Sequence, residues 1–306
     1  MSEFAGQKFL VTGASGFIGA HLCGRLLAGG AEVHGVFRSR PLPGLNVHWW
    51  HVDLAETDAV ERVLKEIKPD VIFHLASEVT GGREPRLVIP TFRSNLASTV
   101  NLLATAREIG CRRFILTGSL EEPEFSKPQG VACSPYAVAK WAGSAYARMF
   151  HALYDLEVVV VRLFMVYGPA QRDLTKLIPY VIVSLLKGES PKLGSGRREV
   201  DWIYVEDVVE ALIAAARAEN VQGRTIDVGS GELVSIRTVV DRIFAFMNSK
   251  FEPGYGALPD RAREPVRSAD VAASRLALGW EPKISLEAGL RRAVDWYSRH
   301  MPGCPG

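Results

Sequence analysis

The chain has 306 residues, of which 47% are hydrophobic and 23% charged, which is the composition of an ordinary globular protein. The length suits one large α/β domain or a domain with a smaller lobe. A net charge of +2 without any basic block argues against a nucleic-acid partner. The absence of an apolar run of about 20 residues, or of a signal-peptide core, argues against a membrane partner.

The cysteines are scattered along the chain without the spacing of metal ligands: Cys23, Cys111, Cys133 and Cys304. Reduced thiols in a cytoplasmic enzyme are the simplest account of them. We therefore expect a cytoplasmic protein without a metal site.

The first predicted strand breaks into a glycine-rich loop. Residues 9–11 are apolar, residues 12–19 read TGASGFIG, and a helical pattern of leucines follows as far as Gly29. Strand, glycine turn and helix in this order indicate a dinucleotide-binding fingerprint, because glycines let the backbone approach a pyrophosphate at the helix N-terminus. The spacing Gly-x-x-Gly-x-x-Gly is one residue longer at its start than the usual dehydrogenase pattern. The residues expected to contact the cofactor here are Gly13, Gly16, Phe17 and Ile18.

The end of the second strand, predicted at residues 32–37, indicates which cofactor binds. An NAD site needs an acidic residue there for the ribose hydroxyls, but this chain continues with Phe37-Arg38-Ser39-Arg40. An arginine at this edge can pair with a 2′-phosphate, so Arg38 predicts that NADP(H) is favoured over NAD(H). The alternative, that both arginines are solvated loop charges, is the preferred interpretation for Arg40.

The following segments continue the alternation of strands and helices. Strands are predicted at 47–52, 71–77 and 114–117, and helices at 58–67 and 91–109. This alternation implies an α/β fold with a parallel doubly wound sheet, which binds ligands at the carboxyl ends of its strands. His74 is interpreted as a packed structural histidine. The cofactor rim is expected to include Asp53, Leu54, Leu75, Ala76 and Ser77.

Candidate catalytic residues follow the strand at 114–117. Ser119 comes first, and a helix predicted at 135–153 then opens with Tyr136 and Lys140. Residues four apart on a helix share one face, so the lysine ammonium is expected to lower the pKa of the tyrosine toward neutrality. A serine hydroxyl at the same rim can hold a carbonyl oxygen while the tyrosine transfers the proton. Beside a nicotinamide, these three side chains make a hydride-transfer site.

Together these segments resemble the extended short-chain dehydrogenase/reductase family. The resemblance rests on TGASGFIG, Asp53-Leu54, HLAS, the serine after the fifth strand, the Tyr136/Lys140 pair and RLFMVYGP. The later motifs DWIYVEDVVEAL, IDVGSGELVSI and LGWEPKISLEAGL are similar to those of the nucleotide-sugar epimerase, dehydratase and ketoreductase branch. The resemblance implies a Rossmann domain in which Tyr136 is the acid/base. By the same resemblance, Lys140 binds the nicotinamide ribose and Ser119 polarises the carbonyl.

Two finer matches favour a subgroup. EVHGVFRSR resembles the GDP-mannose dehydratases, which use NADP, and TGSLEEP is similar to a segment of the GDP-4-keto-6-deoxymannose reductases. Ser119-Leu120-Glu121 keeps the family's glutamate, so Glu121 is a predicted substrate contact. Sugar 4,6-dehydratases of the dTDP-glucose type have an aspartate acid where this chain has Leu120, which cannot supply a proton.

The leading hypothesis is therefore an NADP(H)-dependent reductase of a keto group on a nucleotide-linked deoxy-sugar, with Tyr136 as general acid. One alternative is a nucleotide-sugar epimerase or 4,6-dehydratase that holds its NAD(P) tightly and recycles it. A second alternative is a regulator that binds NAD(P) without catalysis. The intact set of Ser119, Tyr136 and Lys140 argues against that regulator.

The substrate half departs from the family pattern at two positions. Met165 stands where the family usually has an asparagine, and Val200 where it usually has an arginine, so two diphosphate contacts are missing. Either the substrate is not a nucleotide sugar, or other arginines replace these contacts. The candidates for that role are Arg197 or Arg198, and Arg261, which matches a phosphate-binding arginine of the family.

The resemblance also predicts the domain organisation and the assembly. Residues 1–167 and 203–223 are expected to form the dinucleotide-binding domain, and residues 168–202 and 224–306 the smaller substrate lobe. The helix at 135–153 is apolar nearly all round and must be covered on both sides. In the family this helix and the one that corresponds to 91–109 form a four-helix dimer interface, so a homodimer is expected. The alternative is a monomer in which the substrate lobe covers the helix.

Overall fold

The computed structural model describes residues 2–123 and 131–301, and Cys304 lies outside them. The chain divides into two compact units. The first unit comprises Met1–Leu163, Val209–Asp227 and Ala272–Trp280. The second unit comprises Phe164–Val208, Val228–Val271 and Glu281–Gly306.

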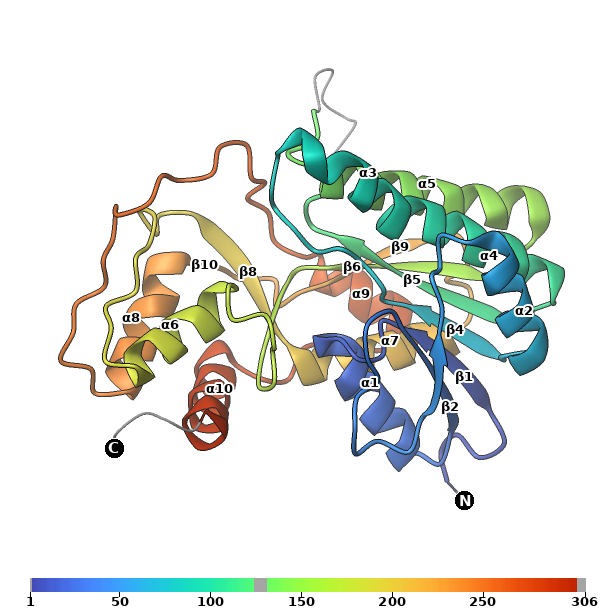
Figure 1. Ribbon diagram of the computed structural model, residues 1–306, viewed down its shortest axis with the longest axis horizontal. Coiled ribbons are helices and arrows are strands. Elements are labelled where there is room, and N and C mark those ends of the chain that lie inside the picture. Colours follow the sequence, from blue (N-terminus) through green and yellow to red (C-terminus); the bar gives the residue numbers. More distant parts are fainter. Residues whose placement is uncertain (1, 124–130, 302–306) are drawn as a thin grey trace. The chain divides into compact units, whose positions relative to one another are not determined.

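The first unit is built on a seven-stranded sheet of order β3-β2-β1-β4-β5-β6-β9 (Figure 1). Its strands are β1 (Lys8–Thr12), β2 (Glu32–Phe37), β3 (His48–His51), β4 (Val71–His74), β5 (Arg113–Ser119), β6 (Val158–Leu163) and β9 (Thr225–Val228). The chain runs outward from β1 to β3 and then returns to β4 on the other side of β1, so the strand order reverses between β1 and β4. This reversal defines the doubly wound Rossmann arrangement and confirms the predicted fold class.

Helices connect these strands. They are α1 (Phe17–Ala28), α2 (Thr57–Ile67), the short 3₁₀ segment η1 (Pro85–Leu87), α3 (Val88–Thr91), the π-helical segment η2 (Phe92–Ala97), α4 (Ser98–Glu108), α5 (Pro135–Tyr154), α7 (Val205–Arg217) and α9 (Val271–Leu278). The helix predicted at 91–109 is thus part of a longer helical stretch that contains a π segment. Such segments displace the chain by one residue within a helix and recur at functional sites.

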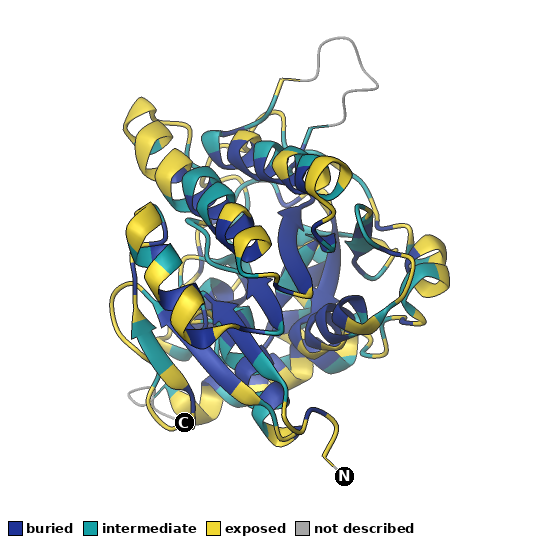
Figure 2. Cartoon of the chain, turned by 90° about the vertical axis from the view of Figure 1, so that its right-hand side faces the viewer, coloured by how far each residue is buried: buried dark blue, intermediate teal, exposed yellow. Residues whose placement is uncertain are grey.

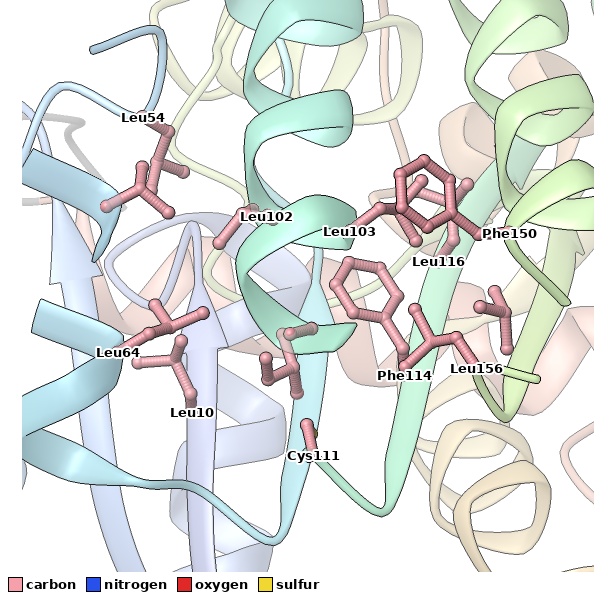
Figure 3. Close-up of a cluster of buried hydrophobic side chains, with 14 of the residues drawn as sticks. Leu10, Leu54, Leu64, Leu102, Leu103, Cys111, Phe114, Leu116, Phe150 and Leu156 are labelled. Carbon is pink, nitrogen blue, oxygen red and sulfur yellow. The ribbon is translucent and has the colours of Figure 1, made fainter. Parts of the chain in front are cut away.

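One face of the sheet packs against α2, α4 and α5. Leu10 of β1 and Phe114 of β5 are fully buried there against Leu102 and Leu103 of α4 (Figure 3). Each such side chain contributes about 1.5–3 kcal/mol when it leaves water. The strands at the centre of the unit are buried throughout, whereas the covering helices keep one exposed side (Figure 2). This rigid core fixes the carboxyl ends of the strands, where the candidate site lies.

The second unit has a smaller mixed sheet of order β10-β8-β7. Its elements are β7 (Met165–Tyr167), β8 (Glu199–Tyr204), β10 (Leu233–Ser235), α6 (Leu177–Leu186), α8 (Ile236–Phe246) and α10 (Leu286–His300). β7 pairs with β8 in parallel and β10 pairs with β8 antiparallel. The apolar faces of α6, α8 and α10 meet Trp202 and Tyr204 of β8 in one core.

The predicted domain bounds differ from these units at residues 164–167, 203–208, 224–227 and 272–280. Residues 165–167 belong to the second unit because β7 pairs with β8. Residues 224–227 and 272–280 belong to the first unit because β9 is the last strand of the large sheet and Ser274 of α9 donates a 2.5 Å hydrogen bond to Asp227 O. No helix within the described residues is long and apolar enough to cross a bilayer.

Candidate active site

The glycine-rich loop between β1 and α1 approaches neighbouring backbone closely. Gly13 has a φ of +67°, and a Cβ on it would lie 2.8 Å from the Ala76 nitrogen. A Cβ on Gly19 would collide with the Gly13 carbonyl oxygen. Helix α1 begins after Gly16 without a side-chain cap and without an acidic residue in its first turn. Its first N–H groups are therefore directed at an anion site, which fits the pyrophosphate of a dinucleotide.

The end of β4 contributes a buried polar chain. Thr12 Oγ1 lies 2.7 Å from His74 Nδ1, and His74 Nε2 lies 2.9 Å from Thr99 Oγ1. Thr99 donates its hydroxyl proton to Asn95 O, so it accepts from His74 Nε2–H. Burial and the neighbouring Lys140 charge lower the pKa of His74 to about 3. His74 is thus a neutral, packed structural histidine, as predicted.

One hydroxyl at this rim lacks a partner. Ser77 Oγ is buried and has no hydrogen-bond partner in the described part of the chain. Buried hydroxyls are usually satisfied, so an unpaired one beside the glycine loop fits a site completed by a cofactor. Leu75 and Ala76 precede it, and Ala76 N donates to Thr12 Oγ1 at 3.1 Å.

The predicted cofactor contacts after β2 and β3, Arg38 and Asp53, are exposed and form ion pairs with neighbouring side chains. Arg38 is 67% exposed, and its guanidinium lies 3.2 Å from Glu78 Oε2 and 3.3 Å from Ser94 Oγ. Asp53 lies 3.7 Å from Arg93. Exposed pairs of this kind are worth about 0–1 kcal/mol, so a bound ligand can replace them at little cost.

The candidate catalytic side chains meet where β5 ends and α5 begins. Ser119 is the last residue of β5. Helix α5 starts at Pro135 because Ser134 caps it, accepting from Ala137 N at 3.1 Å, and proline suits a first turn. Tyr136 and Lys140 are both buried one turn apart, and Lys140 Nζ donates to Thr117 O at 2.9 Å. The structure thus brings the three predicted catalytic residues together.

Burial is the largest influence on the pKa values of Tyr136 and Lys140. It raises the pKa of Tyr136 above its ordinary value, the charges of Glu121 and Glu122 raise it further, and a hydrogen bond with Ser119 opposes them. Burial also lowers the pKa of Lys140 to about 8. The expectation that Lys140 lowers the pKa of Tyr136 is therefore wrong for the cofactor-free chain. The lysine ammonium is directed at Thr117 O, and the buried phenol stays protonated.

Two carboxylates lie beside Ser119. Glu121, the predicted substrate contact, accepts from Ser134 Oγ at 3.4 Å and from Cys133 Sγ at 3.5 Å. Glu122 is 4% exposed and accepts from Ser119 N at 2.8 Å. Glu122 is not among the residues predicted from the sequence. The signal available for it was a second acidic residue three positions after a serine at the end of a buried strand.

Two of the three predicted arginines of the second unit, Arg198 and Arg261, lie near the carboxylate of Glu264. Arg198 Nη1 lies 2.6 Å from Glu264, and Arg261, which is 64% exposed, lies 3.7 Å from the same side chain. Arg197 is exposed and its backbone N–H donates to Ser195 Oγ. Arg198 is thus engaged within the unit. A role of Arg197 or Arg261 in substrate binding stays a prediction.

The segment at Val200 has a structural role instead of a phosphate contact. Val200 is buried in the core of the second unit. The next residue, Asp201, accepts hydrogen bonds from Ser230 N at 2.6 Å, Ser230 Oγ at 2.8 Å, Gly231 N at 2.9 Å and Ala269 N at 2.9 Å. Asp201 therefore fixes the loop after β9 and the segment that enters α9.

Known proteins share this architecture. A family model described as "NAD dependent epimerase/dehydratase family" matches residues 9–229. A UDP-glucose 4-epimerase of Mycolicibacterium smegmatis is 32% identical, with 95% of this chain and 98% of that protein covered. The structure of a Thermotoga maritima UDP-glucose 4-epimerase with UDP-glucose is 26% identical with a TM-score of 0.86, covering 96% of this chain and all of that one. A Thermus thermophilus UDP-glucose 4-epimerase in complex with NAD is 27% identical with a TM-score of 0.85, at the same coverage of both chains.

These matches agree with the strand order and the fold of the chain. The predicted branch of the extended short-chain dehydrogenases/reductases is confirmed. The chain belongs to the NAD-dependent epimerase/dehydratase family and is an oxidoreductase-type enzyme of that family.

Proposed function

We propose that the chain is a nucleotide-sugar 4-epimerase that oxidises a sugar hydroxyl and reduces the resulting ketone on its other face. The epimerase, an alternative in the sequence-based hypotheses, is thus preferred to the NADP(H)-dependent reductase. The observation that carries it is the similarity, over nearly the whole chain, to a UDP-glucose 4-epimerase, together with a complete catalytic set. A UDP-hexose is the substrate class that this similarity supports.

Each residue of the site has a separate role in the proposed reaction. NAD(P), when bound at the glycine loop, would supply the hydride acceptor and donor that this reaction needs. Ser119 binds the sugar oxygen. For the oxidation Tyr136 must first lose its proton to solvent, which the positive charges of Lys140 and of a bound oxidised nicotinamide would favour; the phenolate then takes the hydroxyl proton and gives it back in the reduction. Lys140 stays an ammonium near neutral pH and holds ribose hydroxyls. Tyr136 is buried, which limits the access of water to its hydroxyl.

Epimerisation is expected without net consumption of cofactor. Purified enzyme given UDP-glucose should form the 4-epimer, which proton NMR of the sugar detects. The absorbance of reduced nicotinamide at about 340 nm should stay constant. The physical reason is that each hydride removed is returned to the same molecule. A mixture without enzyme and one with the Lys140→Met variant are the controls. Stoichiometric oxidation of added NADPH by a keto-sugar, with no epimer formed from UDP-glucose, would contradict the proposal.

An NADP(H)-dependent 4-ketoreductase is the second candidate. The raised pKa of Tyr136 keeps its phenol protonated, which a reductase needs at the start of the reaction. Leu120, which offers no proton, is buried where 4,6-dehydratases of the dTDP-glucose type have their acid. Phe37, at the end of β2, leaves no carboxylate in its own position to exclude a 2′-phosphate. These observations favour a reductase over a dehydratase.

We also propose that Arg38 favours NADP(H) over NAD(H). Replacement of Arg38 by alanine removes a charge-assisted hydrogen bond to the 2′-phosphate worth about 1.5–3 kcal/mol. NADP binding should weaken roughly tenfold to a hundredfold while NAD binding stays nearly unchanged, as measured by isothermal titration calorimetry. Arg40→Ala, which removes an exposed arginine two residues away, is the matched control. Equal weakening of both cofactors, or a preference of the unmodified chain for NAD, would contradict this assignment.

A homodimer and a cytoplasmic location stay predictions. The exposed apolar side chains of α3 and η2 support the homodimer, since Val88, Ile89 and Phe92 are each at least 47% exposed. Val138 and Tyr146 of α5 are exposed as well. A cavity of about 450 Å³ lies between these helices, lined in part by Val88, Phe92 and Val138. Apolar surface of this kind is typical of protein interfaces.

A further inference from the structure

Strand β5 extends beyond its neighbour β4 on one side. The pairing of the two strands ends at His74 and Leu116, whereas β5 continues to Ser119. Arg113 N donates toward β4, to Asp70 O, and Leu120 N donates toward β6, to Leu163 O. Because backbone groups two residues apart point to the same side of a strand, the Thr117 carbonyl and the Ser119 N–H face the side where β4 has ended.

Two charged side chains take the place of the missing strand. Lys140 Nζ donates to Thr117 O at 2.9 Å, and Glu122 Oε1 accepts from Ser119 N at 2.8 Å. The two hydrogen bonds flank a single residue, Gly118. A cation and an anion are therefore held on adjacent backbone groups at the same edge.

The space for the Glu122 carboxylate exists because residue 118 is glycine. A Cβ on Gly118 would lie 2.5 Å from Glu122 Oε1. Glu122 N also donates to Ser119 O at 3.0 Å, so the side chain and the backbone of Glu122 together close the turn after β5. Both Glu122 and Lys140 are buried, and an isolated charge in such a place is unfavourable by several kcal/mol.

We propose that Glu122 is a positioning residue of the active site, which fixes the backbone of Ser119 and serves as the counter-charge of the buried Lys140. The inference rests on the proposed function only in taking Ser119 and Lys140 as catalytic. Glu122 does not contact the reacting atoms. It acts through these two neighbours.

The other groups around Lys140 do not replace this charge. His74, from β4, is neutral, and Tyr136, on the same helix, stays protonated. Glu121 and Cys133 face Tyr136. Burial lowers the pKa of Lys140 to about 8, and the charge of Glu122 raises it against that effect. Loss of the Glu122 charge should therefore let Lys140 lose its proton at a lower pH.

The test measures Lys140 directly in the cofactor-free protein. Protein labelled with 13C at the lysine ε-carbons is titrated by NMR, and the Lys140 resonance is assigned from its absence in Lys140→Arg. In Glu122→Gln the amide oxygen can still accept from Ser119 N, so only the charge is lost. The titration midpoint of Lys140 is expected to fall by about one pH unit or more. Glu121→Gln, which removes the adjacent carboxylate, should leave this midpoint in place.

A second variant keeps the proposal testable if Glu122→Gln fails to fold. Gly118→Ala keeps both charged residues but places a methyl group where the carboxylate lies, so the Lys140 midpoint should also fall. Circular dichroism and the unfolding temperature establish that each variant is folded. An unchanged midpoint in the folded variants would overturn the proposal.

The pH profile of turnover provides the functional readout. For Glu122→Gln the basic limb of kcat should move to lower pH, with a loss of about tenfold near pH 8.5 and less than about twofold near pH 6.5. Glu122→Asp, which keeps the charge, should restore most of the profile. A merely structural role would lower kcat equally at all pH values. Should the NMR midpoint shift while no nucleotide sugar reacts, the proposed function fails and this inference stands.

Discussion

Replacement of Tyr136 by phenylalanine is expected to lower kcat for the nucleotide sugar at least about a hundredfold, the scale of a removed general acid or base. The change deletes one hydroxyl and keeps the ring in its buried position on α5. Neither Ser119 nor Lys140 can take and return the proton from the position of the Tyr136 hydroxyl. Initial rates at saturating substrate and near pH 7.5 measure the effect.

The matched control is Tyr146→Phe, ten residues along the same helix, where the ring is 41% exposed. It should keep the parental rate. The affinity of Tyr136→Phe for the cofactor, measured by nicotinamide fluorescence, should fall only slightly. The reason is that the ribose contact expected of Lys140 is intact. If Tyr136→Phe turns over at the parental rate, Tyr136 is not the acid/base.

Replacement of Asp201 by asparagine is expected to cause a large loss of stability in the second unit. Ser230 N and Oγ bond to one carboxylate oxygen of Asp201, and the N–H groups of Gly231 and Ala269 bond to the other. An amide keeps only one acceptor oxygen, so two of these buried or part-buried donors lose their partner, at up to about 1–3 kcal/mol each. We expect a destabilisation of roughly 2–5 kcal/mol in urea unfolding.

Hydrogen exchange followed by mass spectrometry locates this effect. Peptides that contain Gly231 and Ala269 should exchange faster in Asp201→Asn, because the loop is no longer held. Asp241→Asn is the control, since Asp241 is exposed and accepts a hydrogen bond from Tyr255 OH at 2.7 Å. Equal stability of the two variants would show that the Asp201 contacts contribute nothing beyond a surface hydrogen bond.

Local signals in the sequence were sufficient for most of the fold. The strand at 32–37 has the predicted bounds because its apolar run ends at charged residues on both sides. The start of α5 follows from Ser134 and Pro135, whose effects on a helix N-terminus are local. The strand–helix alternation then leaves few topologies, because parallel connections are right-handed and short.

Features that depend on tertiary contacts were not predicted. The π segment η2 places Asn95 so that its side chain holds the backbone of Glu78 on both sides, with Glu78 N donating at 2.6 Å and Glu78 O accepting at 3.1 Å. Periodicity alone cannot reveal such a contact between distant segments. The bounds at 165–167 were wrong for the same reason, since a three-residue strand is defined by its partner.

The sequence predicted that Ser119, Tyr136 and Lys140 lie together, but it did not predict the electrostatics around them. Spacing placed Tyr136 and Lys140 on one helical face, as found. The direction of the Tyr136 pKa was wrong because burial, which depends on every surrounding element, exceeds the influence of one neighbour. Glu122 was overlooked because its role depends on where β4 ends relative to β5.

The division of the chain into units bears on how such an enzyme can be re-engineered. The first unit is assembled from three stretches separated in sequence by parts of the second. A fragment cut at Leu163 would leave β6 as an open sheet edge without β9, and open edges template aggregation. Transplanting the second unit from a relative therefore requires exchanging residues 164–208, 228–271 and 281–306 in a single step. A chimaera with one crossover at Leu163 would also exchange residues 209–227 and 272–280, which belong to the first unit.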